Sequence, residues 1–133
     1  MRASGPPPTT TDRRRCAVLI VDDDRATRDL LRDQLSEAGH RVRTAADGAE
    51  ALERMATERP QLMLFDLSMP TMDGWELRRR MLERHVLAGI PSIALTGEAN
   101  PDVSRLGVDR LVHKPIDTDE LLELVERVAG PPS

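Results

Sequence analysis

Short apolar runs alternate with amphipathic stretches along most of this chain. The short runs predict strands at 16–21, 62–65, 93–95 and 111–113, and a weaker strand at 42–45, where polar residues interrupt the pattern. Between them, apolar residues recur three and four positions apart, as Leu31 and Leu35 do before the helix-ending Gly39. This spacing is typical of helices that bury one face. Asp117 followed by Glu120 has the pattern of a helix start for the last amphipathic stretch.

The order of these elements predicts an α/β fold. The strands are almost wholly apolar, which indicates burial on both faces and therefore a parallel sheet with helices on each side. Five strands alternate with five helices, and the segment 101–107 leaves room for only a shortened fourth helix. In such folds ligands bind beyond the carboxyl ends of the strands.

Length and composition indicate one domain with short tails. Of the 133 residues, 16–130 carry the periodic pattern, whereas 1–15 form a Pro-, Thr- and Arg-rich tail that we expect to be disordered and 131–133 a short C-terminal tail. The single Cys16 excludes a disulfide within the chain and fits a reducing compartment. The sequence lacks an apolar stretch near the ~18 residues of a membrane span and the core of a signal peptide, so we expect a cytoplasmic protein without a membrane partner.

The charge is unevenly distributed. The whole chain carries −4 and residues 1–15 carry +3, which leaves −7 for the remainder. An acidic body argues against nucleic acid as the main ligand. Among 19 basic residues, Lys114 is the single lysine.

Polar side chains follow four of the predicted strands, at the point where each strand ends. They are Asp22, Asp23 and Asp24, then Asp66, Thr96 and Lys114. Parallel strands place their carboxyl ends on one edge, so the fold brings these residues together. Several carboxylates favour a hard cation such as Mg²⁺, and an aspartate can attack phosphorus to form an acyl phosphate. Mg²⁺, a lysine ammonium and a threonine hydroxyl compensate the charge of the transferred group.

Each of these residues also has a simpler interpretation. Asp24 can cap the next helix, Asp66 and Thr96 can be turn residues, and Lys114 can be solvated. An arginine would be too long and too rigidly forked for a compact pocket that needs one point charge. A single such residue is weak evidence, whereas their occurrence at four strand ends is strong.

Four motifs resemble the receiver domain of two-component response regulators. They are Val-Leu-Ile-Val-Asp-Asp-Asp at 18–24, Leu-Phe-Asp-Leu-Ser-Met-Pro-Thr-Met-Asp-Gly at 64–74, Ala-Leu-Thr-Gly at 94–97 and His-Lys-Pro at 113–115. The resemblance covers about residues 16–129 and is of the chemotaxis-regulator type, apparently stand-alone. It implies a flavodoxin-like (βα)5 fold.

The resemblance also implies roles for the residues at the strand ends. Asp66 matches the phosphoacceptor, and Thr96 and Lys114 match the switch hydroxyl and the phosphate-contacting lysine. The Mg²⁺ ligands would be Asp22, Asp23, Asp66 and the backbone carbonyl of Ser68. The expected donor is a phosphohistidine on a sensor histidine kinase or phosphotransfer protein, and the downstream partner is unknown. Lys114-Pro115 is a candidate cis peptide.

Two features depart from the family pattern, and both concern the output face. Leu111 occupies a position that is commonly aromatic, three residues before the lysine. The span from Thr96 to Lys114 is about one helical turn shorter than expected. Elsewhere we expect His40 and His85 on the surface and a structural role for His113.

Three functions remain open from the sequence. The first is a receiver that is phosphorylated on Asp66 and signals through protein–protein interaction or a phosphorelay. It is not an enzyme and catalyses at most its own phosphorylation and dephosphorylation. The second is a receiver-fold interaction module that acts independently of phosphorylation, an alternative prompted by Leu111 and the short fourth helix. The third is a Mg²⁺-dependent phosphatase with an aspartyl nucleophile, against which Ser68 counts because an acid would be expected there.

Overall fold

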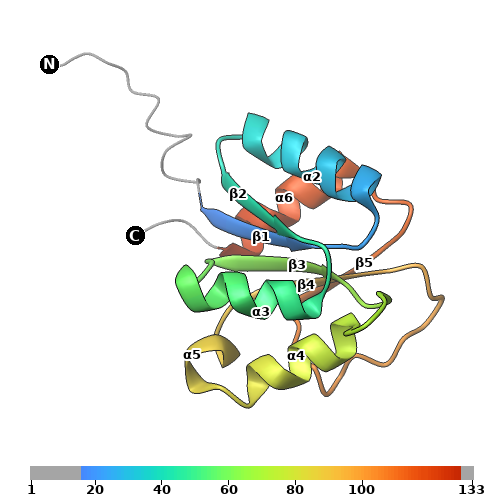
Figure 1. Cartoon of the computed structure of the whole chain (residues 1–133). Coiled ribbons are helices and arrows are strands. Elements are labelled where there is room, and N and C mark those ends of the chain that lie inside the picture. Colours follow the sequence, from blue (N-terminus) through green and yellow to red (C-terminus); the bar gives the residue numbers. More distant parts are fainter. Residues whose placement is uncertain (1–15, 130–133) are drawn as a thin grey trace, which may run out of the picture.

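The computed structural model describes residues 16–129, and the predicted tails at 1–15 and 131–133 lie outside this range. The elements, labelled as in Figure 1, are β1 (Ala17–Val21), α2 (Arg25–Glu37), β2 (Arg41–Ala45), α3 (Gly48–Thr57), β3 (Leu62–Asp66), α4 (Gly74–Leu82), α5 (His85–Ala88), β4 (Ser92–Thr96), β5 (Arg110–His113) and α6 (Thr118–Ala129).

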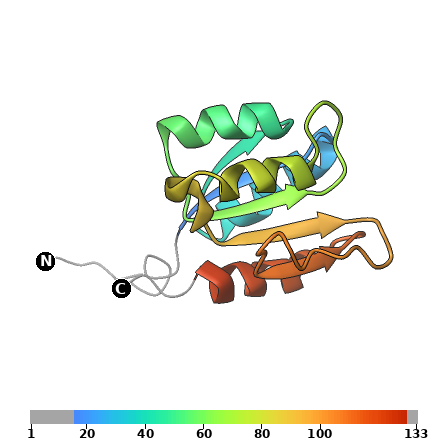
Figure 2. The same ribbon diagram turned by 90° about the horizontal axis from the view of Figure 1, so that it is seen from below.

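The five strands form one parallel sheet in the order β2-β1-β3-β4-β5. Helices α3, α4 and α5 cover one face and α2 and α6 the other, as Figures 1 and 2 show. Strands β3 and β4 are buried along their whole length. The predicted fold class, an α/β sheet with helices on both faces, is confirmed.

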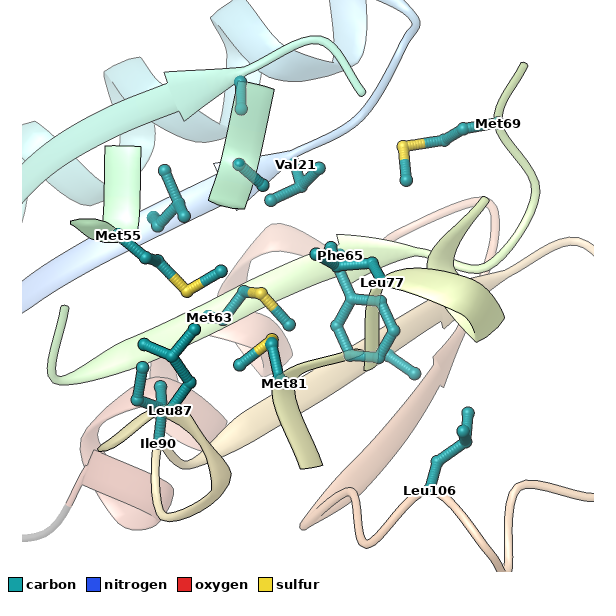
Figure 3. Close-up of a cluster of buried hydrophobic side chains, with 14 of the residues drawn as sticks. Val21, Met55, Met63, Phe65, Met69, Leu77, Met81, Leu87, Ile90 and Leu106 are labelled. Carbon is teal, nitrogen blue, oxygen red and sulfur yellow. The ribbon is translucent and has the colours of Figure 1, made fainter. Parts of the chain in front are cut away.

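Each face of the sheet has its own apolar cluster. The cluster under α3 and α4 contains four buried methionines and Phe65. Met55, Met63 and Met81 lie close together in Figure 3, near Phe65. The cluster under α2 and α6 is aliphatic and includes Ile20, Leu35 and Val125. Unbranched methionine side chains fill irregular gaps in a core with few aromatic rings. Among the described residues, the longest helices are too short and too polar to cross a membrane.

Aspartates begin three of the helices at the edge where the strands end. Asp24, Asp47 and Asp73 accept a hydrogen bond from the backbone N–H three residues later. Such caps satisfy N–H groups that the helix itself leaves unpaired. The interpretation of Asp24 as a helix cap, separate from its two neighbours, is therefore confirmed.

The segment 97–109, which connects β4 to β5, differs from the prediction. We expected a short helix at 101–107, but the described chain has only a turn at 104–107 (Figure 2, orange). Pro101 lacks an N–H, the Asp102 carboxylate accepts from the Ser104 N–H, and Gly107 has φ +64°. All three favour a turn over a helix. The fifth helix is instead α5, a single turn after α4 that is too short to be read from periodicity.

Candidate functional site

The predicted site residues lie together at the carboxyl edge of the sheet. Asp22 follows β1, Asp66 ends β3 and Thr96 ends β4. Lys114 follows β5 and donates hydrogen bonds from Nζ to Asp22 Oδ2 at 3.1 Å and to Asp66 Oδ2 at 2.8 Å. Parallel pairing thus brings an ammonium and two carboxylates into contact although 92 and 48 positions separate them.

The carboxylates of this site are shielded from water. The Asp22 side chain is 0% exposed and that of Asp66 8%, while Lys114 is 28% exposed. Backbone N–H groups hold both carboxylates in place: Asp24 N–H donates to Asp22 and Ser68 N–H donates to Asp66, each at 2.9 Å. These bonds leave fewer orientations open to the acceptor oxygens and so pre-organise the site.

Asp22, Asp23 and Asp66 each offer a carboxylate oxygen, and the three oxygens lie within 4.8 Å of one another. Asp23 is exposed, so the group opens to solvent. An all-oxygen donor set of this kind suits a hard divalent cation that keeps some of its waters, as Mg²⁺ does. The residues present therefore fit the predicted cation. Whether the Ser68 carbonyl completes the set stays a prediction.

The charges of the site are unbalanced, because three carboxylates face one ammonium. Burial raises the pKa of the Asp22 carboxyl, and the hydrogen bonds from Asp24 and Lys114 only partly oppose this. Partial burial lowers the pKa of the Lys114 ammonium, but hydrogen bonds to Asp66 and Asp22 outweigh it, so its pKa is raised. A further cation would stabilise the ionised form of Asp22.

Thr96 lies at the same edge and is buried. Its Oγ accepts a hydrogen bond from the Glu98 N–H at 2.9 Å, and its carbonyl accepts from the Lys114 N–H at 2.7 Å. The hydroxyl proton remains available for a second partner. The sheet therefore holds the backbones of Lys114 and Thr96 in register, and the Glu98 N–H holds the Thr96 side chain.

Two glycines allow the loops around the site to approach closely. A Cβ on Gly74 would lie 2.3 Å from the carbonyl oxygen of Asp66 and 2.8 Å from the Leu67 Cα. On Gly48 it would lie 2.7 Å from the sulfur of Met72. Gly74 N–H also donates to the Leu67 carbonyl at 3.0 Å. The Asp-Gly pair at 73–74 thus packs α4 directly against the end of the strand that carries Asp66.

Some expectations about single residues were wrong or incomplete. His40, expected on the surface, is 5% exposed and accepts the Cys16 N–H at Nδ1. The α2–β2 turn places it beside Cys16, just before the start of β1, which its position after a glycine did not indicate. His85 is exposed as expected. Lys114-Pro115 is cis, which confirms the candidate.

Sequence reasoning missed Arg78, a charged residue on the buried face of α4, at helical spacing with Gly74, Leu77 and Met81. It is 3% exposed, and its guanidinium donates to the carbonyls of Leu106 and Gly107. The signal that could have found it is its spacing: position 78 shares the helix face of Leu77 and Met81, whereas Arg79 and Arg80 are exposed.

Comparison with known proteins shows the family of this chain. Residues 18–126 match the family described as "Response regulator receiver domain", and the chain belongs to this family. An uncharacterized 14.6 kDa protein of Leptolyngbya boryana is 40% identical over 115 residues, which covers 82% of this chain and 88% of that protein. The transcriptional regulator NtrC of Escherichia coli is 36% identical over 108 residues, 78% of this chain but 23% of NtrC.

Solved receiver structures superpose closely. The chemotaxis protein CheY4 of Vibrio cholerae has a TM-score of 0.80 at 32% identity, and the match covers 84% of this chain and 97% of CheY4. A putative response regulator of Chloroflexus aurantiacus has the same TM-score at 29% identity. The resemblance to chemotaxis-type receivers is confirmed, and with it a phosphoacceptor role in signal transduction.

Proposed function

We propose that Asp66 accepts a phosphoryl group from a phosphohistidine on a sensor histidine kinase or phosphotransfer protein. In the transfer, an Asp66 carboxylate oxygen forms a bond to phosphorus while the bond from phosphorus to the donor imidazole nitrogen breaks. The product is an acyl phosphate on Asp66. The carrying observation is that Asp66, at a buried strand end, contacts the sole lysine and shares an acidic group with Asp22 and Asp23.

The surrounding residues support this chemistry by position and charge. Mg²⁺ held by Asp22, Asp23, Asp66 and the Ser68 carbonyl would compensate the charge of the phosphoryl oxygens. Lys114 already donates to Asp66 and can turn the same donor to a phosphoryl oxygen. Thr96 retains a hydroxyl proton for another phosphoryl oxygen.

Signalling would follow from a change in the surface near Thr96 and β5, through binding of a partner protein. We infer no enzymatic activity toward other molecules. A steady turnover of phosphomonoesters would need a general acid, and the position two residues after Asp66 is Ser68, which is a poor acid.

A second candidate is an interaction module that does not depend on phosphorylation. It is favoured by Leu111, which packs against the core and has no ring that could swing between positions. Partner affinity decides between the two. Equal affinities for the untreated protein, the beryllofluoride-treated protein and Asp66→Ala would favour the second candidate.

Labelling by acetyl phosphate tests the proposed function. With Mg²⁺, intact mass should increase by one phosphoryl group, and chelation of Mg²⁺ or Asp66→Ala should abolish the increase. Asp24→Asn is a matched control, because it removes a nearby carboxylate while asparagine still caps the helix. Labelling that survives in Asp66→Ala would refute the assignment.

A further inference from the structure

The helix-free crossover between β4 and β5, residues 97–109, is fixed at both ends and exposed between them. A receiver-like sheet would ordinarily have this connection covered by a helix that satisfies its own backbone. Here the crossover must obtain hydrogen bonds from elsewhere, and the contacts that supply them come from α4 and β5. These contacts decide how the crossover can move.

Arg78 of α4 supplies the contacts at the far end. Its Nε donates to the Leu106 carbonyl at 2.8 Å and its Nη2 to the Gly107 carbonyl at 3.3 Å. At 3% exposure this arginine is unusual, because charged side chains are rarely buried unless they are paired. Burial lowers the pKa of the guanidinium, and the charge of Asp109, at the end of the crossover, opposes that effect.

Near the candidate site, other residues hold the crossover. The Glu98 N–H donates to Thr96 Oγ, and His113 Nε2 lies 3.1 Å from the Ala99 carbonyl oxygen. His113 is directly opposite Thr96 in the β4–β5 register. A movement of Thr96 would therefore first displace residues 98–99.

Between these two anchors, the crossover is mostly solvent-exposed. Residues 97–100 are exposed, as are Asp102, Ser104 and Arg105, whereas Leu106 is buried under α4. A partner protein could contact polar side chains and backbone groups of this segment, which is anchored at both ends.

We propose that Arg78 is a positioning residue for the phosphorylation switch: it fixes the far end of the crossover, so that a shift of Thr96 changes the exposed stretch at 97–105. The exposed crossover is thereby the surface that reports phosphorylation to a partner protein, a role that an aromatic side chain at position 111 would otherwise have. This inference rests on the proposed function, since it requires a phosphoryl group or its analogue at Asp66.

The Arg78 guanidinium also gives a reason why the crossover could have two conformations of similar stability. Arg78 Nη1 is buried and has no hydrogen-bond partner among the described residues. A buried, unpaired donor is unfavourable, so a rearranged crossover that brings a carbonyl to Nη1 would recover part of that free energy. Differential contacts of this kind are what a two-state switch requires.

Backbone hydrogen exchange, measured by mass spectrometry with and without Mg²⁺ and beryllofluoride, tests the inference. In the wild-type protein we expect exchange over residues 97–109 to change by about threefold or more when the analogue binds. Arg78→Met keeps an apolar stem of similar length in a methionine-rich core but removes the donors. In this variant, hydrogen exchange at 103–109 should be about tenfold faster than in the wild type, both with and without beryllofluoride. The change in exchange on adding beryllofluoride should therefore be lost. Arg80→Met, an exposed position on the same helix, is the matched control and should keep the wild-type response.

Two further variants separate positioning from packing. Arg78→Lys restores a positive charge and a donor, so it should restore part of the response, which a purely space-filling role would not require. His113→Ala, at an exposed position, should speed exchange at 97–101 and leave 103–109 unchanged. A wild-type response in Arg78→Met, or exchange at 97–109 that is unaffected by the analogue in the wild type, would overturn the inference.

The outcomes distinguish this inference from the proposed function. A phosphoryl adduct on Asp66 together with an unchanged crossover overturns the inference alone. If acetyl phosphate and Mg²⁺ give no adduct on Asp66, the proposed function fails, and the inference fails with it.

Discussion

Replacing Lys114 with methionine removes the ammonium that balances Asp22 and Asp66. Breaking a fully buried ion pair from one side costs about 3–5 kcal/mol, because the remaining charge is left uncompensated. Lys114 is 28% exposed, so water screens part of this loss. We expect Lys114→Met to lower the free energy of unfolding by about 2 kcal/mol without Mg²⁺, or about 8 °C in Tm for a domain of this size.

The same substitution should have the opposite effect on Mg²⁺ binding. It makes the acidic group of Asp22, Asp23 and Asp66 more negative, so the Kd for Mg²⁺ should fall by roughly tenfold. Thermal unfolding with a chelator and across a Mg²⁺ titration measures both effects. Arg110→Met, an exposed cation on β5, is the control and should stay within about 0.5 kcal/mol of wild type. A Lys114→Met protein as stable as wild type in chelator, or one with weaker Mg²⁺ binding, would refute this reasoning.

Three further predictions follow from other contacts. Burial lowers the pKa of His40 below its usual value of 6.5, so that on acidification the unfolded chain binds the proton before the folded protein does. The free energy of unfolding should therefore be at its full value above pH 6.5 and should decrease below it by up to about 1.4 kcal/mol per pH unit. Urea unfolding should show that His40→Gln loses this slope and that exposed His85→Gln keeps it. Gly74→Ala should destabilise by about 3 kcal/mol or more because its Cβ would lie 2.3 Å from a backbone oxygen. Gly48→Ala should destabilise by less, because the nearest atoms belong to the flexible Met72 side chain and the Met72 backbone oxygen is 3.0 Å away; equal losses in chemical unfolding would contradict this. Added Mg²⁺ should raise the Tm of the wild-type protein, and Asp23→Asn, at an exposed position, should remove most of that shift; a full shift in Asp23→Asn would exclude Asp23 as a ligand.

The sheet and the meeting of the site residues could be predicted because both follow from short-range signals. Apolar runs that end on Asp22, Asp66 and Thr96 define parallel strands, and parallel pairing alone places their ends on one edge. Lys114 joins them for the same reason. The helix caps at Asp24 and Asp73 are likewise local, since the acceptor and the N–H lie three residues apart.

The features that escaped prediction depend on long-range contacts. The crossover at 97–109 has local signals for a turn at Pro101, Asp102 and Gly107, but it is held in place by Arg78, which lies 28 and 29 positions away from its acceptors. His40 is buried because its ring accepts the N–H of Cys16, 24 residues earlier. In both cases the deciding partner is a backbone group, and backbone groups are the same at every position of a sequence.

The residue that carries the phosphoryl group is the central claim, and borohydride reduction tests it directly. Borohydride converts an aspartyl phosphate to homoserine at the modified position, which peptide sequencing by mass spectrometry then identifies. After treatment with acetyl phosphate and Mg²⁺, the account predicts homoserine at position 66. Homoserine at position 22 or 23 with aspartate intact at 66 would contradict it.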